Sequence, residues 1–245
     1  MYNFVSISAA LATVSLTSGF APLAKKAQHA GAHHTALNVA SLNGWQPDES
    51  KFAFGLPGSL DPSPDFDPFG FADRADLIQM KSYRESETTH GRVAMLAVIG
   101  FLVTEAPFEF HPLFDTGSKD IGPAIRHLDE VRAAAPFFFE ILAVAIGAAE
   151  LKRALTGWES PDTDTGRVLK EDYFPGDIGF DPLGLKPDDP DEFMNMSTKE
   201  LQHGRLAMLA VAGFVAQELV DGKEILVHAG LAPDDFDPSS LPVQF

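Results

Sequence analysis

Apolar residues of this chain are concentrated in three stretches with helical character. The stretches span about residues 73–105, 135–156 and 190–220. In the first stretch, apolar positions run from Val93 to Thr104, and Pro107 follows. The second and third stretches have similar runs, so the pattern predicts an all-α protein built on three long helices.

Polar residues, prolines and glycines predict where these helices begin and end. Asp73 is suited to cap the first helix, and the sequence SYRE at residues 82–85 resembles a capping box. The other boundary signals are Pro136 and Gly157 for the second helix, and Asp189, Pro190, Asp221 and Gly222 for the third.

One motif occurs twice. Residues 87–101 read ETTHGRVAMLAVIGF and residues 200–214 read ELQHGRLAMLAVAGF, so 11 of 15 positions are identical. Each copy follows a related turn, FDPFGF at residues 66–71 and FDPLGL at residues 180–185. Because the repeat covers a turn plus a helix, the chain is predicted to contain a duplicated, pseudo-symmetric unit.

Each copy places a glutamate, a histidine and an arginine at the edge of the apolar run. Glu87 and His90 are three residues apart and project from one helix face. Arg92 points roughly 140° away from Glu87 at ~100° per residue, so it cannot readily neutralise Glu87 within one helix. The second copy has the same geometry. We therefore expect the two helices to cross, so that Arg92 pairs with Glu200 and Arg205 pairs with Glu87.

Small residues supply a surface for that crossing. Small residues let helix backbones approach closely, above all in lipid. An ordinary alanine-rich core has similar stripes, but duplication beside the charges favours a two-fold contact. The stripe comprises Gly91, Ala94, Ala97 and Gly100, repeated as Gly204, Ala207, Ala210 and Gly213.

Hydropathy alone does not decide between a soluble helical core and a membrane bundle. No apolar run reaches the ~18 residues of a self-evident transmembrane helix. The whole first stretch, residues 73–105, would nevertheless form a helix roughly 50 Å long, which exceeds the ~40–45 Å of a bilayer with its headgroups. This length favours three transmembrane helices, of which the first and third cross about a pseudo-two-fold axis.

The paired charges suggest metal chemistry. An interhelical Glu–Arg pair is formally neutral, and it leaves carboxylate lone pairs that could bind a metal. The neutral rings of His90 and His203 offer nitrogen ligands. Duplicated Glu-x-x-His also occurs in di-iron carboxylate bundles, which take further glutamates from two more helices. For Glu200 there is a local alternative, since residues 197–200 fit a capping box.

Composition narrows the function classes. The chain has 18 basic and 35 acidic residues, so nucleic acid is not an expected partner. It has no cysteine, and hence no disulfide or thiolate metal site. No nucleophile–base group, phosphate loop or dinucleotide fingerprint is present, which favours a protein that is not an enzyme.

The N-terminal region differs from the rest of the chain. The first 47 residues contain no Asp or Glu and only Lys25 and Lys26 for charge. We predict that residues 1–37 are a cleaved targeting segment, with a disordered tail as the alternative, and that residues 38–245 form the folded domain.

These motifs together resemble the light-harvesting chlorophyll-binding proteins, especially the fucoxanthin–chlorophyll a/c antennae of algae with red-lineage plastids. The resemblance spans about residues 45–225 and rests on the doubled ExxHGRxAMLAVxGF motif with its FDPxGx turns. SGFAP at residues 18–22 resembles the junction of the two-part plastid targeting sequences of those algae.

The resemblance implies a photosynthetic antenna in the plastid thylakoid membrane. Such a protein would hold chlorophyll a, chlorophyll c and fucoxanthin or related xanthophylls, and would pass excitation energy to a photosystem. Its neighbours would be thylakoid lipids, other antenna subunits and a photosystem core. A photoprotective, energy-dissipating role in the same family is one alternative, and a soluble di-iron oxidase is an alternative of another class.

The resemblance also implies ligands for chlorophyll magnesium. Gln217 would be a further amide ligand, with Thr104 at the corresponding position of the first copy. Glu150 with Arg153 resembles a ligand and its local cation, although a surface ion pair is the alternative. Glu140 is a candidate without a cation within four residues on its helix. The ligands implied by the two motifs are Glu87 with Arg205, Glu200 with Arg92, His90 and His203.

The remaining histidines and the aromatic turns receive weaker assignments. We expect His228 to be a solvent-facing loop residue rather than a ligand. The FDPxGx turns resemble the contacts that the family makes with carotenoid ends. No role is assigned to His33, His34, His111 or His127.

Overall fold

The computed structural model describes residues 42–108, 110–113, 122–160 and 168–233. These residues all belong to the second of two units into which the chain divides, Leu37–Phe245. Within them the secondary structure is helical, with one isolated β-bridge between Trp158 and Leu169. The 3-10 helices are η1 (Phe52–Gly55) and η2 (Ala124–Arg126), and the α-helices are α1 (Leu77–Thr104), α2 (His127–Ala134), α3 (Phe138–Gly157), α4 (Pro190–Asp221) and α5 (Ile225–His228).

Helix α1 begins later than the sequence signals suggested. Its N-cap is Asp76, not Asp73, and the capping box forms with Gln79 rather than within residues 82–85. The Asp76 carboxylate accepts a hydrogen bond from the Gln79 backbone at 2.7 Å. Ser82 lies inside the helix, where its hydroxyl donates to the Ile78 carbonyl. Both aspartates suit a cap, and the reciprocal glutamine three residues on distinguishes Asp76.

Helix α4 begins and ends at the residues expected from the sequence. The Asp189 carboxylate accepts from the Glu192 backbone, and Pro190 occupies the first turn. Gly222 ends the helix in the left-handed conformation, with φ 66°. Ser197 lies in the interior of this helix, so the capping box at residues 197–200 is wrong.

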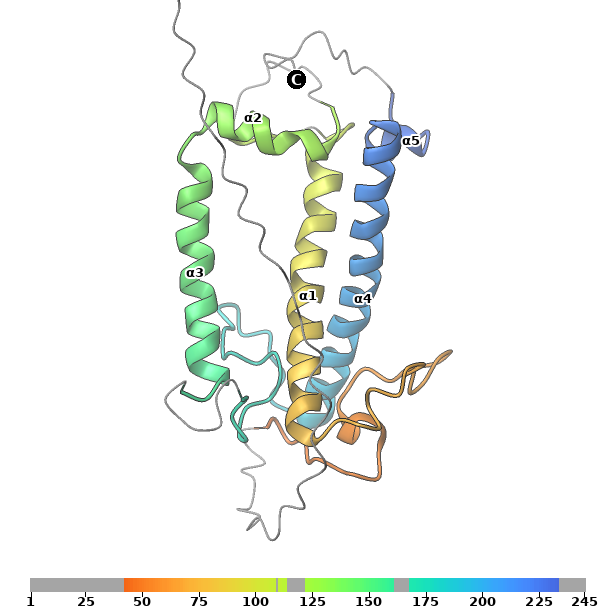
Figure 1. Ribbon diagram of the computed structural model, residues 1–245, viewed down its shortest axis with the longest axis vertical. Coiled ribbons are helices and arrows are strands. Elements are labelled where there is room, and N and C mark those ends of the chain that lie inside the picture. Colours follow the sequence, from red (N-terminus) through yellow and green to blue (C-terminus); the bar gives the residue numbers. More distant parts are fainter. Residues whose placement is uncertain (1–41, 109, 114–121, 161–167, 234–245) are drawn as a thin grey trace, which may run out of the picture. The chain divides into compact units, whose positions relative to one another are not determined.

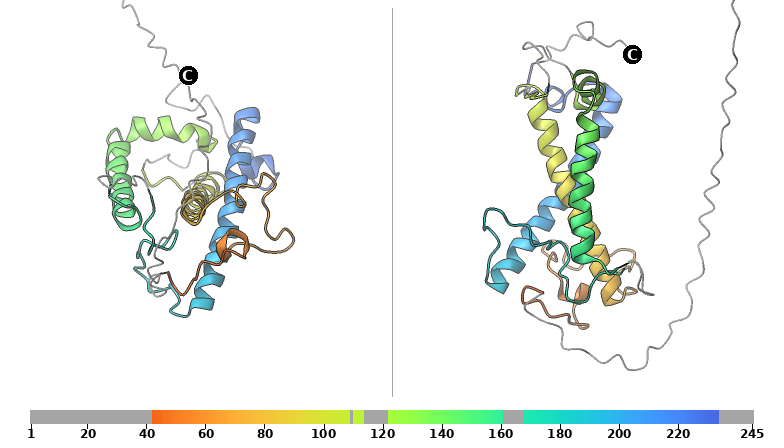
Figure 2. Two further views of the ribbon diagram at one scale, coloured as in Figure 1. Left: turned by 60° about the horizontal axis from the view of Figure 1, so that its bottom comes forward. Right: turned by 90° about the vertical axis from the view of Figure 1, so that its left-hand side faces the viewer.

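Helices α1 and α4 cross at the small-residue stripe (Figures 1 and 2). A Cβ atom built on Gly91 would lie only 2.9 Å from the Gly204 Cα, and the reverse substitution would be equally close. Glycine at both positions therefore permits direct backbone contact. Farther along the stripe the helices diverge, because a Cβ on Gly100 or Gly213 would have nothing within 4 Å.

The sequence analysis did not predict α2 or α5. Helix α2 runs between the C-terminal end of α1 and the N-terminal end of α3 in Figure 1, and α5 follows the C-terminal end of α4. Helix α3 begins at Phe138, two residues after Pro136, and ends at Gly157. His127 begins α2, and His228 ends α5 rather than lying in a loop.

Buried glutamates stabilise the C-terminal ends of α1 and α4. Glu105 is fully buried, and its two oxygens accept from the backbone N–H groups of Ala124 at 3.1 Å and Ile225 at 2.8 Å. Glu218 and Glu224 are also buried and accept from backbone N–H groups of this region, at 2.9 Å and 3.0 Å respectively. These contacts join the ends of α1 and α4 to η2 and α5.

A small apolar core lies at the N-terminal ends of α1 and α4. It gathers the segment before α1, Met80 of α1 and the loop before α4. Trp45 contacts Phe174 edge to face, and Phe174 contacts Phe193 of α4 in the same way. The buried members are Leu42, Trp45, Ala53, Leu56, Met80 and Phe174.

Much of the apolar surface of the long helices is exposed. Val144 of α3 and Leu209 of α4 are 74% and 75% exposed, and α3 is exposed along most of its length. Among the described helices, none taken singly combines the length and apolarity of a membrane span. Only the segments Ala124–Ala134 and Phe138–Gly157, bent by 108°, do so together on length and composition.

The helix crossing can be tested with two glycines of the same stripe. We expect Gly91→Ala to lower the thermal unfolding midpoint by several degrees, because overpacking of this kind costs about 1–3 kcal/mol. Gly100→Ala is the matched control. It should be neutral or stabilising, since alanine favours a helix over glycine by ~1 kcal/mol. Far-UV circular dichroism during heating measures both, and equal effects of the two substitutions would contradict a close crossing at Gly91.

Candidate pigment-binding site

Two ion pairs join α1 and α4 at their crossing. The Arg92 Nε of α1 lies 2.6 Å from Glu200 Oε1, and its second terminal nitrogen lies 3.3 Å from Glu200 Oε2. The Arg205 Nε of α4 lies 2.7 Å from Glu87 Oε1. The structure thus brings together the two pairs that the sequence geometry required, and each glutamate remains about one-third exposed.

Each arginine also binds a backbone carbonyl in a Pro-Gly turn. Arg92 donates to the Gly176 carbonyl at 2.8 Å, and Arg205 donates to the Gly58 carbonyl at 2.6 Å. Both glycines have positive φ, 86° for Gly176 and 114° for Gly58. A Cβ on Gly176 would also approach Thr88 of α1 to 2.9 Å. These turns therefore need glycine, and each holds its arginine through a hydrogen bond separate from the one to the glutamate.

The two motif histidines point outward with one ring nitrogen already engaged. Nδ1 of His90 lies 2.7 Å from the Ser86 carbonyl, and Nδ1 of His203 lies 2.8 Å from the Lys199 carbonyl. A carbonyl oxygen only accepts, so Nδ1 carries the proton in both rings. The lone pair is then on Nε2, which forms no hydrogen bond with the described residues. This arrangement is typical of a histidine prepared to bind a metal through Nε2.

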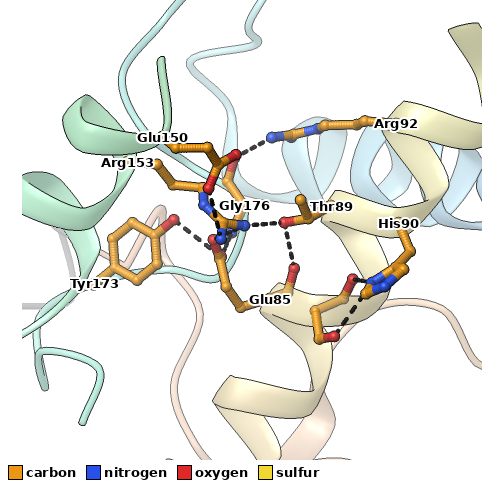
Figure 3. A network of polar contacts seen from close by, with 9 residues as sticks. Glu85, Thr89, His90, Arg92, Glu150, Arg153, Tyr173 and Gly176 are labelled. Carbon is orange, nitrogen blue, oxygen red and sulfur yellow. Dashed lines mark hydrogen bonds and ion pairs between the residues drawn. The ribbon is translucent and has the colours of Figure 1, made fainter. Parts of the chain in front are cut away.

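Glu150 and Arg153 of α3 form the local ion pair that the sequence suggested, at 3.0 Å. Arg153 does more than neutralise Glu150, however. It donates to the Thr89 hydroxyl at 2.5 Å and lies 3.6 Å from the Glu85 carboxylate, both on α1 (Figure 3). One guanidinium therefore serves two carboxylates and attaches α3 to α1.

Glu85 is the most buried carboxylate of this network, with a side chain only 3% exposed. Its Oε2 accepts from the Gly176 backbone at 2.6 Å and from the Tyr173 hydroxyl at 3.0 Å (Figure 3). Burial and the neighbouring Glu85 carboxylate raise the pKa of Tyr173, so its hydroxyl stays protonated and donates. Glu85 thus ties the Pro-Gly turn before α4 to α1.

The remaining predicted ligands have simpler surroundings. The Gln217 amide nitrogen is buried and forms no hydrogen bond among the described residues. Glu140 is exposed in the first turn of α3, without an ion pair in the described part of the chain. Thr104, the counterpart of Gln217, donates to the Gly100 carbonyl. The Nδ1 atom of His228 contacts the Asp221 carboxylate at the end of α4.

The two FDPxGx turns have the same conformation. Gly70 and Gly184 both have φ 65°, which requires the left-handed region. Asp67 accepts the Ala72 backbone N–H at 2.6 Å, and Asp181 accepts the Lys186 backbone N–H at 2.8 Å. These backbone hydrogen bonds lower the pKa of both aspartates. The apolar side chains of the turns are exposed, namely Phe66, Phe69, Phe71, Phe180, Leu183 and Leu185.

The geometry does not favour a shared metal cluster. Within the described residues, no group of three or more His, Asp or Glu side chains could hold one metal ion. Glu87 and Glu200 are each engaged by arginine, and the two histidines point outward from different helices. Separate single-ligand sites on a helix surface agree better with these positions than a di-iron centre does.

Sequence reasoning missed several residues of the site. Arg84, one turn before Glu87, lies 3.3 Å from that carboxylate and also donates to the Pro57 carbonyl. Its i,i+3 spacing from Glu87 was a usable signal. Glu85 and Tyr173 gave no signal of this kind, because their partners lie on other elements. The Pro-Gly dipeptides at residues 57–58 and 175–176 precede both FDPxGx turns and could have been recognised as part of the repeat.

Comparison with known proteins connects this geometry to a family. The family model described as "Chlorophyll A-B binding protein" matches residues 52–219. The chain is 51% identical over 176 residues to the fucoxanthin-chlorophyll a-c binding protein of Isochrysis galbana, covering 70% of this chain and 80% of that one. It is 50% identical over 187 residues to the light-harvesting complex stress-related protein 3.2 of Chlamydomonas reinhardtii, covering 75% and 71%. It is 32% identical over 201 residues to the chlorophyll a-b binding protein CP24 10A of Solanum lycopersicum, covering 72% and 73%.

A double-mutant cycle tests the Arg92–Glu200 pair. Arg92→Gln should destabilise the protein by about 1–3 kcal/mol, because it leaves the partly buried Glu200 carboxylate without its cation. Adding Glu200→Gln should restore much of that loss, since the uncompensated charge is then removed. Thermal unfolding of the two single variants and the double variant gives the coupling energy.

The exposed pair Lys51–Asp48, at 3.7 Å, supplies the control for this cycle. Lys51→Gln should change stability by less than ~0.5 kcal/mol. Additive effects of the two substitutions at Arg92 and Glu200 would show that the interhelical pair contributes no coupling.

Proposed function

The chain belongs to the chlorophyll a/b-binding protein family, and on that basis we propose that it is a photosynthetic light-harvesting antenna. It holds chlorophylls and carotenoids at fixed positions and passes excitation energy toward a photosystem. The protein contributes placement and electrostatic tuning, whereas the bound pigments absorb the light. The role is therefore one of binding rather than catalysis.

The observation that carries the proposal is the hydrogen bonding and exposure of His90 and His203. Each ring donates from Nδ1 to a carbonyl of its own helix, and its outward Nε2 has no partner among the described residues. In chlorophyll the two positive charges of Mg²⁺ are balanced by the dianionic ring. A neutral nitrogen therefore suffices as the axial ligand. An exposed imidazole among apolar side chains such as Val93 and Leu206 suits a large apolar ring with a metal at its centre.

The glutamates fit the same chemistry once their charge is compensated. Glu87 and Glu200 each have an arginine at 2.6–2.7 Å and remain about one-third exposed. A carboxylate oxygen has two lone pairs, so one can accept the guanidinium while another binds magnesium. Glu150 with Arg153 provides a third compensated carboxylate, on α3.

Two further ligands complete the proposed set. The side chain of Gln217 has a buried amide nitrogen without a partner among the described residues, and its carbonyl oxygen is a neutral ligand. Glu140 is exposed and without an ion pair in the described part of α3, so it would add an uncompensated charge to any site. We therefore propose Gln217 in preference to Glu140 as a ligand for chlorophyll magnesium.

The exposed apolar helices support a membrane location. Soluble proteins rarely expose apolar patches as extensive as those of α1, α3 and α4. We propose that α1, α3 and α4 are three membrane-spanning helices, with pigments and lipids covering these faces. In this arrangement α1 and α4 are related by a pseudo-two-fold axis through the Gly91–Gly204 contact, and the charged residues lie in a neutralised layer between them.

The family and the relatives define the pigments and the compartment. The antenna lies in the thylakoid membrane of the plastid and takes chlorophyll a, chlorophyll c and fucoxanthin or a related xanthophyll. Its partners are other antenna subunits and a photosystem core, within thylakoid lipid. The targeting segment proposed at residues 1–37 lies outside the described residues.

A second candidate function is energy dissipation. The chain is as similar to the stress-related light-harvesting proteins of Chlamydomonas reinhardtii as to the fucoxanthin-chlorophyll protein, at 50% and 51% identity. The fluorescence lifetime of the purified pigmented protein distinguishes the two roles. A long lifetime at neutral and acidic pH supports harvesting, whereas a marked shortening at acidic pH supports dissipation.

Pigment uptake provides the direct test of the proposal. The chain, purified with detergent and refolded with extracted chlorophylls and carotenoids, should give a coloured complex. Carotenoid excitation should then appear in the fluorescence excitation spectrum of chlorophyll a, because energy transfer requires both pigments on one protein. Failure of the wild-type chain to retain chlorophyll through gel filtration would refute the proposal.

Removal of a single histidine gives the site-specific prediction. His90→Leu and His203→Leu should each lower the chlorophyll content by roughly one molecule per chain while the helices persist, because each removes one axial ligand. His228→Leu is the control, since that ring pairs with Asp221. Pigment chromatography with protein quantification measures the ratio. If both motif variants kept the full chlorophyll content, these histidines would not be ligands.

A further inference from the structure

The two crossed glutamates have unequal surroundings. Glu200 is contacted by Arg92 alone, with no second ion pair in the described residues. Glu87 is contacted by Arg205 at 2.7 Å and also by Arg84 at 3.3 Å, each through a different carboxylate oxygen. The set around Glu87 therefore carries one positive charge in excess, whereas the Arg92–Glu200 pair is neutral.

The sequence repeat explains this difference. A separation of 113 residues relates the two motifs, and it pairs Arg84 with Ser197. Serine cannot supply a cation, so the second guanidinium exists in one copy only. Arg84 is also far more buried than Arg205, with side chains 9% and 37% exposed. Its polar contacts with Glu87 and the Pro57 carbonyl both lie outside α4.

The loop before α1 fixes Arg84 in that position. The guanidinium donates to the Pro57 carbonyl, and a Cβ on Gly58 would lie 2.7 Å from its terminal nitrogen. Arg205 binds the adjacent Gly58 carbonyl at 2.6 Å. The two arginines therefore flank Glu87 beneath one Pro-Gly turn, beside a hollow of about 400 Å³ that all three side chains line.

From this geometry we propose that Arg84 is a second counter-cation and positioning residue for Glu87. If the proposed function holds, the Glu87 and Glu200 sites differ in how far each depends on an arginine from the other helix. The Glu87 site keeps a compensated ligand when Arg205 is lost, because Arg84 remains on the same helix. The Glu200 site does not, because Arg92 is its single cation in the described structure.

The test compares the two arginines of the crossing. The full chain and its Arg92→Leu and Arg205→Leu variants are refolded with extracted chlorophylls and carotenoids. Arg205→Leu should retain most of the wild-type yield of pigmented complex. Arg92→Leu should lower it roughly tenfold or more, because an uncompensated carboxylate is left at the crossing. Equal losses in the two variants would overturn the proposal.

Further substitutions separate the charge of Arg84 from its structural contact with the loop. In the Arg205→Leu background, Arg84→Lys should retain pigment, whereas Arg84→Gln should lower the yield to the level of Arg92→Leu. Adding Glu87→Gln to the latter double variant should restore pigment, because a neutral amide needs no cation. Absence of that rescue would assign Arg84 a structural role only and contradict the inference.

A pigment-independent readout distinguishes failure of this inference from failure of the proposed function. The loss of helical circular dichroism on heating should rank the same variants in the same order, with Arg92→Leu less stable than Arg205→Leu. If the wild-type chain took up no pigment, the proposed function would fail, while this ranking would still decide the role of Arg84. An inverted or absent ranking would refute it.

Discussion

The direct contact between Gly91 and Gly204 is the constraint on which the rest of this structure depends. Neither motif arginine can neutralise the glutamate of its own helix, because five residues place them on different faces. Only a close crossing brings Arg92 and Arg205 within 2.6–2.7 Å of the opposite carboxylates. The absence of side chains at the two glycines thus determines where the charges meet, and the paired charges in turn disfavour other crossing positions.

The ion pairs also explain how a polar layer can exist among helices with exposed apolar faces. Each arginine also donates a hydrogen bond to a Pro-Gly carbonyl, at Gly58 or Gly176. The loops therefore contribute to the site as much as the helices do. Outside this layer, His90 and His203 need no charge partner, because their Nδ1 protons are bound within their own helices. The charged and the neutral candidate ligands of one repeated motif are thus supported by different contacts: arginines for the glutamates, and backbone carbonyls for the histidines.

The sequence allowed the repeated part of the molecule to be predicted, and much less of the rest. The long helices and the Asp189 cap follow from residue spacing within one segment. The crossed Glu–Arg pairs follow from the duplication of the motif. The N-terminal cap was misplaced by three residues because Asp73 and Asp76 are chemically equivalent, and the reciprocal Gln79 was overlooked. The partners of Glu85 could not be predicted, because they come from a loop and a helix more than 60 positions away. Arg84 was accessible to the same i,i+3 reasoning that identified Arg153.

The position of α3 depends on a different principle from that of the α1–α4 pair. No glycine contact joins α3 to α1 in the described structure. The link is the Arg153 guanidinium, which reaches Thr89 and Glu85, together with the loop residue Tyr173 (Figure 3). Because one cation is shared by Glu85 and Glu150, the ion pair that compensates Glu150, a proposed ligand, also links its helix to α1. The charge compensation of Glu150 and the placement of the middle helix are therefore coupled, whereas the crossed pair keeps its geometry through backbone contact.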